Sequence, residues 1–455
     1  MNRSKSIATV VSPQPPAQRP WEGKREQRFE RWLSAPGIRF ASPAAEQGYH
    51  ARLTRIIRAI RVQEPDRVPC LLPAGQFPAS YAGITVRTAM YDYEEMKRAW
   101  RKFLYDFDGD TCVIPGVSVT SGRLHEITKT RMSVWPGHGL AENAPMAQFV
   151  EGEYMKADEY DALLKDPADF FMRVYLPRTL GAFEPFQKLL PFRRAFGMPA
   201  VFLGACMLPE VQEAFQAVID AGKELAKFRQ AVAEISKEAQ AAGYPPFHGG
   251  FAHAPFDLFG DTLRGTRGIM MDMYRQPAKL QEAMEVVTPW IVEGAVSGAD
   301  VSGVPITFMA LHKGDDTFMS EKQFETFYWP GLKKVILGLV AEGCVPLLFA
   351  EGCYNKRLEA VKDLPEGSVI WWFDRTDMAR AKKILGDRNC IAGNVPTSLM
   401  CTGTPREVKE HCRNLIEVCG KRGGYILTGG AQVHNTTAEN LRAMVEAAKE
   451  YGVYQ

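Results

Sequence analysis

The sequence lacks the features that mark several large classes of protein. No stretch of about 18 apolar residues occurs, so we expect no transmembrane helix. Positive charge is hardly in surplus, because 55 Lys and Arg stand against 53 Asp and Glu, a net charge of +2. A protein that holds nucleic acid through its phosphates needs an excess of basic residues. We therefore expect neither a membrane protein nor a nucleic-acid-binding protein.

The sequence also lacks the features of disulfide-rich proteins and of exported proteins. The nine cysteines are scattered along the chain, and none of them forms a C-x-x-C pair. An odd number of scattered cysteines is typical of reduced thiols rather than of a disulfide framework. The first residues are polar and basic and lack the apolar stretch of a signal peptide. The sequence thus predicts a cytoplasmic location.

The composition divides the 455 residues into a short arm and one large domain. Residues 1–45 are rich in Pro, Ser, Arg and Gln, which predicts an extension. Trp21, Phe29 and Trp32 favour an arm packed on a neighbour, as in a homodimer, over a fully disordered tail, and a partly ordered tail without a catalytic part stays open as the alternative. Residues 46–455 are long enough for a barrel with an insertion. We expect a mainly helical insertion around residues 125–243, where the pattern is helical and charged.

Short apolar runs alternate with helical patterns in the second half of the chain. We expect strands in residues 345–350, 368–373, 390–395 and 425–430, and a further strand within residues 300–309. Residues 248–254 form a glycine-rich segment that continues this alternation after a long helical stretch. Thr404 and Glu407 have capping-box spacing, as do Thr436 and Glu439, so both pairs predict helix starts. Strands that alternate with helices form a parallel sheet. Because no G-x-G-x-x-G or G-x-x-x-x-G-K-[ST] motif favours an open nucleotide-binding sheet, we predict a closed (β/α)8 barrel.

Polar residues follow these strands at the end where a parallel barrel holds its functional groups. Residues 345–350 are followed by Glu351, Cys353 and Asn355, and the strand before them is followed by His312 and Asp316. Three further candidates lie in or after other predicted strands: His253, Asn394 and His434.

Acidic, thiol and imidazole groups at one barrel mouth suit a Zn²⁺ ion. The candidate metal ligands are Glu351, Cys353, His434 and His312. The alternative is a hydrogen-bonded polar rim around an organic ligand without metal. The candidate catalytic groups are Glu351, Asp316 and His312, and the candidates for cofactor contact are Asn394, Asn355 and His253.

The last third of the chain resembles the uroporphyrinogen decarboxylase superfamily, in particular its corrinoid-dependent methyltransferase branch. The similar stretches are residues 300–330, 350–355 (AEGCYN), 373–377 (FDRTD), 392–396 (AGNVP) and 425–440 (YILTGGAQVHNTTAEN). The resemblance implies a (β/α)8 TIM barrel of the uroporphyrinogen decarboxylase type, with its active site at the mouth.

Two departures narrow the activity that the resemblance implies. Decarboxylases of this type carry an Arg-rich segment after the first strand to hold a polycarboxylate, whereas residues 71–77 (LLPAGQF) contain no Arg. Members that methylate thiols carry His-x-Cys and a later Cys. Here the corresponding positions are Glu351, Cys353 and Ala431.

The methyltransferase component of aryl methyl ether O-demethylase systems is more similar. Its members are associated with a zinc pattern Glu-x14-Glu-x20-His, which falls here on Glu351, Glu366 and Asp387. Glu366 directly precedes the predicted strand of residues 368–373, whereas Glu351 directly follows the predicted strand of residues 345–350. We therefore expect these two carboxylates at opposite ends of the barrel.

The resemblance implies transfer of a methyl group from an aromatic methyl ether to cob(I)alamin. Zn²⁺ would polarise the ether oxygen, or Glu351 or Asp316 would protonate it. Because the chain has no Asp-x-His-x-x-Gly segment of corrinoid-binding domains, the cobalamin is expected on a separate corrinoid protein. Two alternatives stay open: a metal-free decarboxylase or lyase, and a non-catalytic protein that binds a tetrapyrrole or aromatic ligand.

Overall fold

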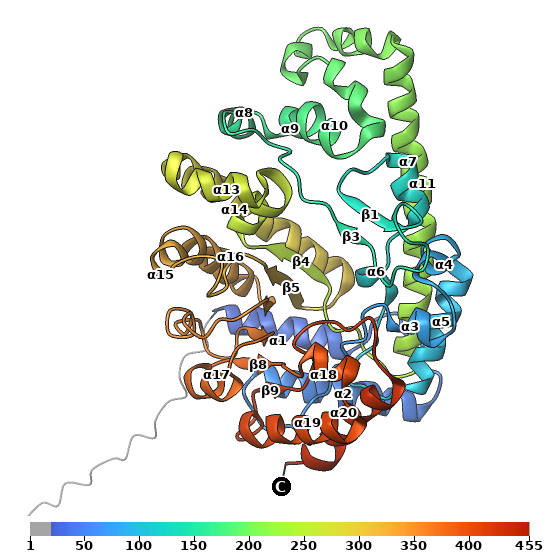
Figure 1. Cartoon of the computed structure of the whole chain (residues 1–455), viewed down its shortest axis with the longest axis vertical. Helices are drawn as coiled ribbons and strands as arrows, with labels where there is room; N and C mark the ends of the chain where they lie inside the picture. Colours follow the sequence, from blue (N-terminus) through green and yellow to red (C-terminus); the bar gives the residue numbers. More distant parts are fainter. Residues whose placement is uncertain (1–19, 455) are drawn as a thin grey trace, which may run out of the picture.

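The computed structural model describes residues 20–454 and shows a closed parallel barrel (Figure 1). Six strands form one sheet in sequence order: β4 (Gly250–His253), β5 (Ile306–Leu311), β6 (Val345–Ala350), β7 (Ile370–Phe373), β8 (Cys390–Ala392) and β9 (Tyr425–Ile426). Two extended segments complete the ring. The N–H of Leu71 donates to the carbonyl of Leu427, and the N–H of Cys112 donates to that of Pro245. The N–H of Asp110 joins the two segments through the carbonyl of Cys70. The predicted (β/α)8 fold is confirmed.

Helices connect the strands on the outside of the barrel. Between the two extended segments lie α3 (Phe77–Tyr81), α4 (Val86–Tyr91) and α5 (Tyr93–Asp106). Between β4 and β5 lie α12 (Pro255–Asp257), η5 (Leu258–Leu263), α13 (Gly265–Arg275) and α14 (Pro277–Ser302). Between β5 and β6 lie α15 (Glu321–Gln323), η6 (Phe324–Tyr328) and α16 (Trp329–Ala341). The later connections hold α17 (Met378–Leu385), α18 (Thr397–Thr402) and α19 (Pro405–Cys419), and α20 (Ala438–Tyr451) follows β9.

A long segment separates the second extended segment from β4 and rises beyond the barrel (Figure 1). Its helices are α6 (Pro115–Ser118), α7 (Gly122–Thr128), α8 (Tyr160–Lys165), α9 (Pro167–Phe170), η1 (Phe171–Tyr175), α10 (Leu176–Thr179), η2 (Gly181–Lys188), η3 (Phe192–Ala195), η4 (Pro199–Met207) and α11 (Pro209–Ala241). It also contains a small sheet of β1 (Ser133–Pro136), β2 (Gly139–Leu140) and β3 (Gln148–Phe149), which the helical pattern did not indicate.

Alternation along the strands divides the apolar core into two layers. Met309, Leu348 and Trp371 face outward and pack in the layer between barrel and helices. Ile306, Leu347 and Ile370 face inward, and Trp372 packs against that inner layer. Because both faces of each strand are covered, β6 is buried at every position. The two adjacent tryptophans therefore have different surroundings, and only Trp372 points into the barrel.

Two helices close the amino-terminal end of the barrel. α1 (Pro20–Leu33) and α2 (Pro43–Ile60) contribute Phe29, Trp32 and Leu53 to the inner layer. The predicted extension therefore packs on its own chain from residue 20 onward, while residues 1–19 lie outside the described part. Across residues 20–454, every helix is either too short or too polar to traverse a bilayer.

The helix starts follow the capping rules with one shift in position. Thr404 and Glu407 form the predicted capping box at α19. At α20 the cap is Thr437, whose side chain accepts a hydrogen bond from the N–H of Asn440. The prediction of Thr436 as the cap is wrong by one residue, because its hydroxyl donates to the carbonyl of Met400 instead.

Candidate functional site

The mouth of the barrel is a cavity of about 780 Å³ at the carboxyl ends of β5, β6 and β7. Its walls include Phe308, Ala310 and His312 from β5 and the residue after it. Phe349 and Glu351 come from β6 and the residue after it. Side chains at the ends of neighbouring parallel strands therefore converge on one space, as the strand-end rule predicts.

His312 and Glu351 face each other across this cavity. His312 Nε2 lies 3.6 Å from Glu351 Oε1, and on the other side of the ring His312 Nδ1 lies 2.6 Å from Asp261 Oδ2. A carboxylate on Nδ1 fixes the orientation of an imidazole and leaves Nε2 free to act in the cavity. Each ring nitrogen of His312 therefore lies beside one carboxylate: Nδ1 beside Asp261 and Nε2 beside Glu351.

The charges around His312 hold a proton on it. Burial opposes the imidazolium, but the hydrogen bond to Asp261 and the charges of Glu351 and Asp261 outweigh burial and raise the pKa of His312 from 6.5 to about 9. For Glu351, burial raises the pKa, although the positive charge of His312 acts in the opposite direction. At neutral pH the pair therefore keeps a proton on His312 Nε2, beside Glu351 Oε1.

A buried carboxylate holds the backbone of the loop that bears His312. Asp257 accepts hydrogen bonds from the N–H groups of His312 and Lys313, both at 3.1 Å, and from the hydroxyl of Tyr328 at 2.6 Å. Burial, followed by the charge of Asp261, raises the pKa of Asp257 to about 7. Lys313 in turn forms a 2.5 Å ion pair with Asp261, so the two aspartates position His312 together.

Glu351 is placed by a tight turn directly after β6. Gly352 has a φ of 79°, a left-handed conformation that glycine adopts without strain. Its N–H donates to Asp374 Oδ2 at 3.0 Å, which ties the turn to the end of β7. The side chain of Glu351 is 41% exposed, so it lies at the rim and not in the core.

The inner face of the mouth is aromatic. The rings of Phe349 and Trp372 have centroids 4.4 Å apart, and Phe308 lies 6.2 Å from Phe349. The indole N–H of Trp372 donates to the carbonyl of Gly429 at 2.7 Å, which fixes the plane of the ring. An aromatic, apolar wall therefore lines the same cavity as the His312–Glu351 pair.

The structure places several predicted residues in connections between loops instead of at the mouth. Asp316 accepts from the N–H of Lys356 at 3.0 Å and lies 3.5 Å from Arg357. Asn394 donates to the carbonyls of Asp374 and Thr376, and Asn355 accepts from the N–H of Asp377. These contacts tie the three side chains to neighbouring loops, and none of the three lines the mouth. Asp316, Asn355 and Asn394 are therefore not placed to act on a ligand in the mouth.

Two predicted histidines lie close to the site without joining the proton-holding pair. His434 lines the mouth, and its Nδ1 accepts from the N–H of Gln76 at 3.3 Å. His253 packs edge-on against Phe251, with centroids 4.7 Å apart. Burial lowers the pKa of both His253 and His434, so both imidazoles are neutral at pH 7.

The predicted zinc ligands are only partly brought together. His312, Glu351 and His434 line the mouth, but Cys353 accepts a hydrogen bond from Asn355 and does not line it. Within residues 20–454, no three His, Cys, Asp or Glu side chains are grouped as a metal site requires. The donor set does not fit a protein-bound zinc ion.

The Glu-x14-Glu spacing does not describe a site in this barrel. Glu366 and Asp387 precede β7 and β8 and line a cleft with Arg25, Arg61 and Arg388. This cleft is at the amino ends of the strands, whereas Glu351 lies at their carboxyl ends. The expected separation of Glu351 from Glu366 is confirmed.

Sequence reasoning missed Asp257, Asp261 and Lys313. The two aspartates lie four residues apart in the helical segment after β4, which places them on one face. Pro255 begins that segment directly after the strand, so a short D-x-x-x-D pattern at a strand end was the available signal.

A model of the family described as uroporphyrinogen decarboxylase (URO-D) matches residues 207–451, more than half of the chain. The chain belongs to the uroporphyrinogen decarboxylase family. The match contains β4 through β9 and both members of the His312–Glu351 pair. The resemblance predicted from the last third of the sequence is thus confirmed at the level of the family.

Relatives in this family are distant. The uroporphyrinogen decarboxylase of Chlorobaculum parvum is 24% identical over 216 residues, which is 44% of this chain and 59% of the relative. That of Flavobacterium johnsoniae is 21% identical over 303 residues, or 64% of this chain and 79% of the relative. The first of these matches thus spans less than two thirds of its relative.

A solved structure has the same fold over almost the whole chain. A methyltransferase from Methanosarcina mazei superposes with a TM-score of 0.56 at 17% identity, covering 88% of this chain and 98% of the other. At this identity the likeness establishes the fold alone.

Proposed function

We propose that this family member transfers a methyl group from a small aromatic methyl ether to a reduced corrinoid, cob(I)alamin, carried by a separate protein. The observation that supports this proposal most directly is the His312–Glu351 pair, which holds a proton in the same cavity as an aromatic wall, at an open barrel mouth. The likeness to a solved methyltransferase is consistent with this chemistry.

The chemistry requires a proton because an alkoxy-aromatic group leaves poorly as a phenolate. The electron pair of cob(I)alamin forms the new Co–C bond as the C–O bond breaks, and the bonding electrons of the C–O bond remain on oxygen. A proton from His312 Nε2 converts that oxygen to a phenol hydroxyl. The products are a phenol and methylcobalamin, and the site must regain one proton from solvent.

Each residue of the pair has a separate task in this step. His312 carries the proton, and Asp261 orients the ring through Nδ1. Glu351 keeps the imidazolium charged through its negative charge on the opposite side. Phe349 and Trp372 form the aromatic wall against which the substrate is oriented so that methyl and cobalt are aligned, which lowers the entropic part of the barrier.

Decarboxylation of an octa-anionic porphyrinogen is poorly supported by the same geometry. Such a substrate needs many charge-assisted partners. Of the described residues that line the mouth, Arg375 is the one with a permanent positive charge, and its side chain is 70% exposed beside Asp374. The missing Arg-rich segment of residues 71–77 therefore has no replacement at the mouth.

The proposal is tested by mixing the full chain with cob(I)alamin-loaded corrinoid protein and a panel of guaiacol-like ethers. We expect the cob(I)alamin absorption to be replaced by that of methylcobalamin, with one phenol released per methyl group. The same reaction after dialysis against a metal chelator should proceed unchanged, because the described side chains of the mouth are not grouped as a metal site requires. Absence of methylcobalamin across the panel would contradict the proposal, and formation of CO2 from aromatic acids would favour a decarboxylase.

A further inference from the structure

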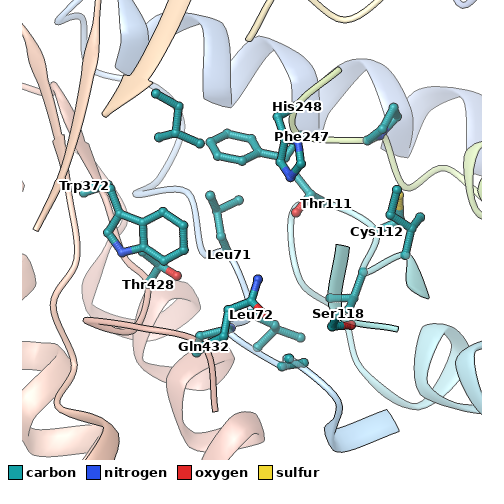
Figure 2. Close-up of a pocket in the computed structure, with 18 residues that line it drawn as sticks. Leu71, Leu72, Thr111, Cys112, Ser118, Phe247, His248, Trp372, Thr428 and Gln432 are labelled. Atoms are coloured by element: carbon teal, nitrogen blue, oxygen red, sulfur yellow. The ribbon is translucent and has the colours of Figure 1, made fainter. Parts of the chain in front are cut away.

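A second cavity lies inside the barrel, beneath the mouth. Its volume is about 110 Å³, and it shares Trp372 and Gln432 with the mouth (Figure 2). An engineered apolar cavity of about 150 Å³ binds benzene, so a cavity of this size is suited to one small ring. Trp372 is thus a wall common to the mouth and the inner cavity.

The surface of this inner cavity is apolar and uncharged. Leu71, Leu72, Phe247 and Trp372 supply much of its wall (Figure 2). Leu347 also lines it. The small side chain of Ala392 leaves room where a larger inward-facing residue would fill the barrel. Among the residues that the structure describes, no Asp, Glu, Lys or Arg lines it.

The polar groups of the cavity are neutral hydrogen-bonding groups. Thr111, Ser118 and Gln432 contribute hydroxyl and amide groups, and His248 faces Trp372 from the opposite side (Figure 2). Burial lowers the pKa of His248 to about 4 and raises that of Cys112 to about 12, so both groups are uncharged at pH 7. His248 forms no hydrogen bond with any other residue in the described range 20–454.

We infer that the inner cavity is the ring-binding subsite of the enzyme and that it selects uncharged aromatic ethers against those bearing a carboxylate. This inference rests on the proposed function, because the methyl group must point to the mouth, where the corrinoid arrives. A substituent opposite the methoxy group then enters the cavity. A hydroxyl there finds neutral partners, whereas a carboxylate would be buried without a cation.

The matched ligands for the test are 4-methoxyphenol and 4-methoxybenzoate, which differ in the group opposite the methoxy substituent. Binding is measured by isothermal titration calorimetry on the full chain without corrinoid. We expect saturable binding of 4-methoxyphenol and a dissociation constant for 4-methoxybenzoate that is larger by about tenfold or more. Equal affinity for the two ligands, or no binding of 4-methoxyphenol, would overturn the inference.

A charge-introducing variant tests the location of the subsite. Leu72→Arg places a cation at the cavity wall, so it should tighten 4-methoxybenzoate binding by about tenfold and weaken 4-methoxyphenol binding. The control is Val301→Arg on α14, at a position that is 87% exposed and outside the cavity, which should leave both dissociation constants unchanged. An unchanged preference in a folded Leu72→Arg protein would contradict the assignment. Should that variant fail to fold, the comparison of the two ligands on the unmodified chain decides the inference.

Turnover separates this inference from the proposed function. If 4-methoxybenzoate is demethylated as efficiently as 4-methoxyphenol, methyl transfer stands and the charge selection is refuted. If 4-methoxyphenol binds selectively but no ether yields methylcobalamin, the cavity stands as a binding site and the methyltransferase proposal fails.

Discussion

The environment of His312 determines when the site holds its proton. Its folded-state pKa of about 9 lies above the ordinary value of 6.5, so the folded protein binds this proton more tightly than the unfolded chain does. The resulting stabilisation is fully present below about pH 6.5 and is lost as the pH rises through about 9.

We expect methyl transfer to fall as the pH rises through about 9, because the imidazolium then loses its proton. The measurement is the single-turnover rate of methylcobalamin formation between pH 6 and pH 10. A rate that is independent of pH across this interval would show that His312 does not supply the proton.

Replacing Glu351 by Gln should lower the pH at which the rate declines, because the charge that favours the imidazolium is removed. At pH 8 we expect the rate to decrease by about tenfold or more. The melting temperature should change little, because Glu351 is at the rim with 41% of its side chain exposed. A large loss of stability with an unshifted pH profile would instead make Glu351 a structural residue.

The sequence predicts which residues lie where the chain leaves a strand. It does not predict the direction in which their side chains point. His312 and Glu351 follow β5 and β6 directly, and the strand-end rule located both. Cys353, Asn355 and Asp316 lie two or more residues further along, where the loops turn away from the mouth. Asn355 donates to the thiol of Cys353, while Asp316 and Asn355 accept hydrogen bonds from backbone N–H groups of the loops. Asp261 comes back to the mouth through a helical turn, so the D-x-x-x-D spacing was its available signal and the strand-end rule alone did not select it.

At the scale of elements, the strands with two covered faces were the most predictable. β6 coincides with the apolar run of residues 345–350, because burial on both faces leaves a continuous apolar pattern. The runs predicted at residues 390–395 and 425–430 are longer than β8 and β9, since their last residues enter loops at the mouth. The two extended segments near Cys70 and Cys112 have few ladder bonds and gave no comparable signal.

The caps of α19 and α20 give a test at this scale. Replacing Thr404 or Thr437 by Ala removes a side-chain acceptor at a helix start and should lower the free energy of unfolding by about 1 kcal/mol each. Denaturant titration measures this change. For comparison, Thr436→Ala leaves the α20 cap in place and removes a hydrogen bond to Met400. Methyl transfer should be unaffected in both cap variants, and a catalytic defect would show that the caps also position the mouth.

At the scale of the whole molecule, the apolar layer that stabilises the barrel and the proposed active site lie at opposite ends of the barrel. α1 and α2 close the amino-terminal end with an apolar layer, while the opposite end stays open above the inner cavity. Buried Asp110, paired with Arg55 and Arg67, joins α2 to the second extended segment. The position of the open end could be predicted from the direction of the strands. The inner cavity could not, because it depends on the packed side chains of segments as distant as Leu72, His248 and Ala392.

The proton held at His312 is the central claim, and its most direct test compares leaving groups in a His312→Gln variant. The ethers are 4-methoxyphenol, whose product oxygen needs a proton, and 4-nitroanisole, whose nitrophenolate leaves without one. The variant should transfer the methyl group of 4-methoxyphenol slower by about a hundredfold or more, with a much smaller loss for 4-nitroanisole. His434→Gln, a second histidine of the mouth, is the matched control and should affect both ethers equally. Equal losses for the two ethers in His312→Gln would contradict the account.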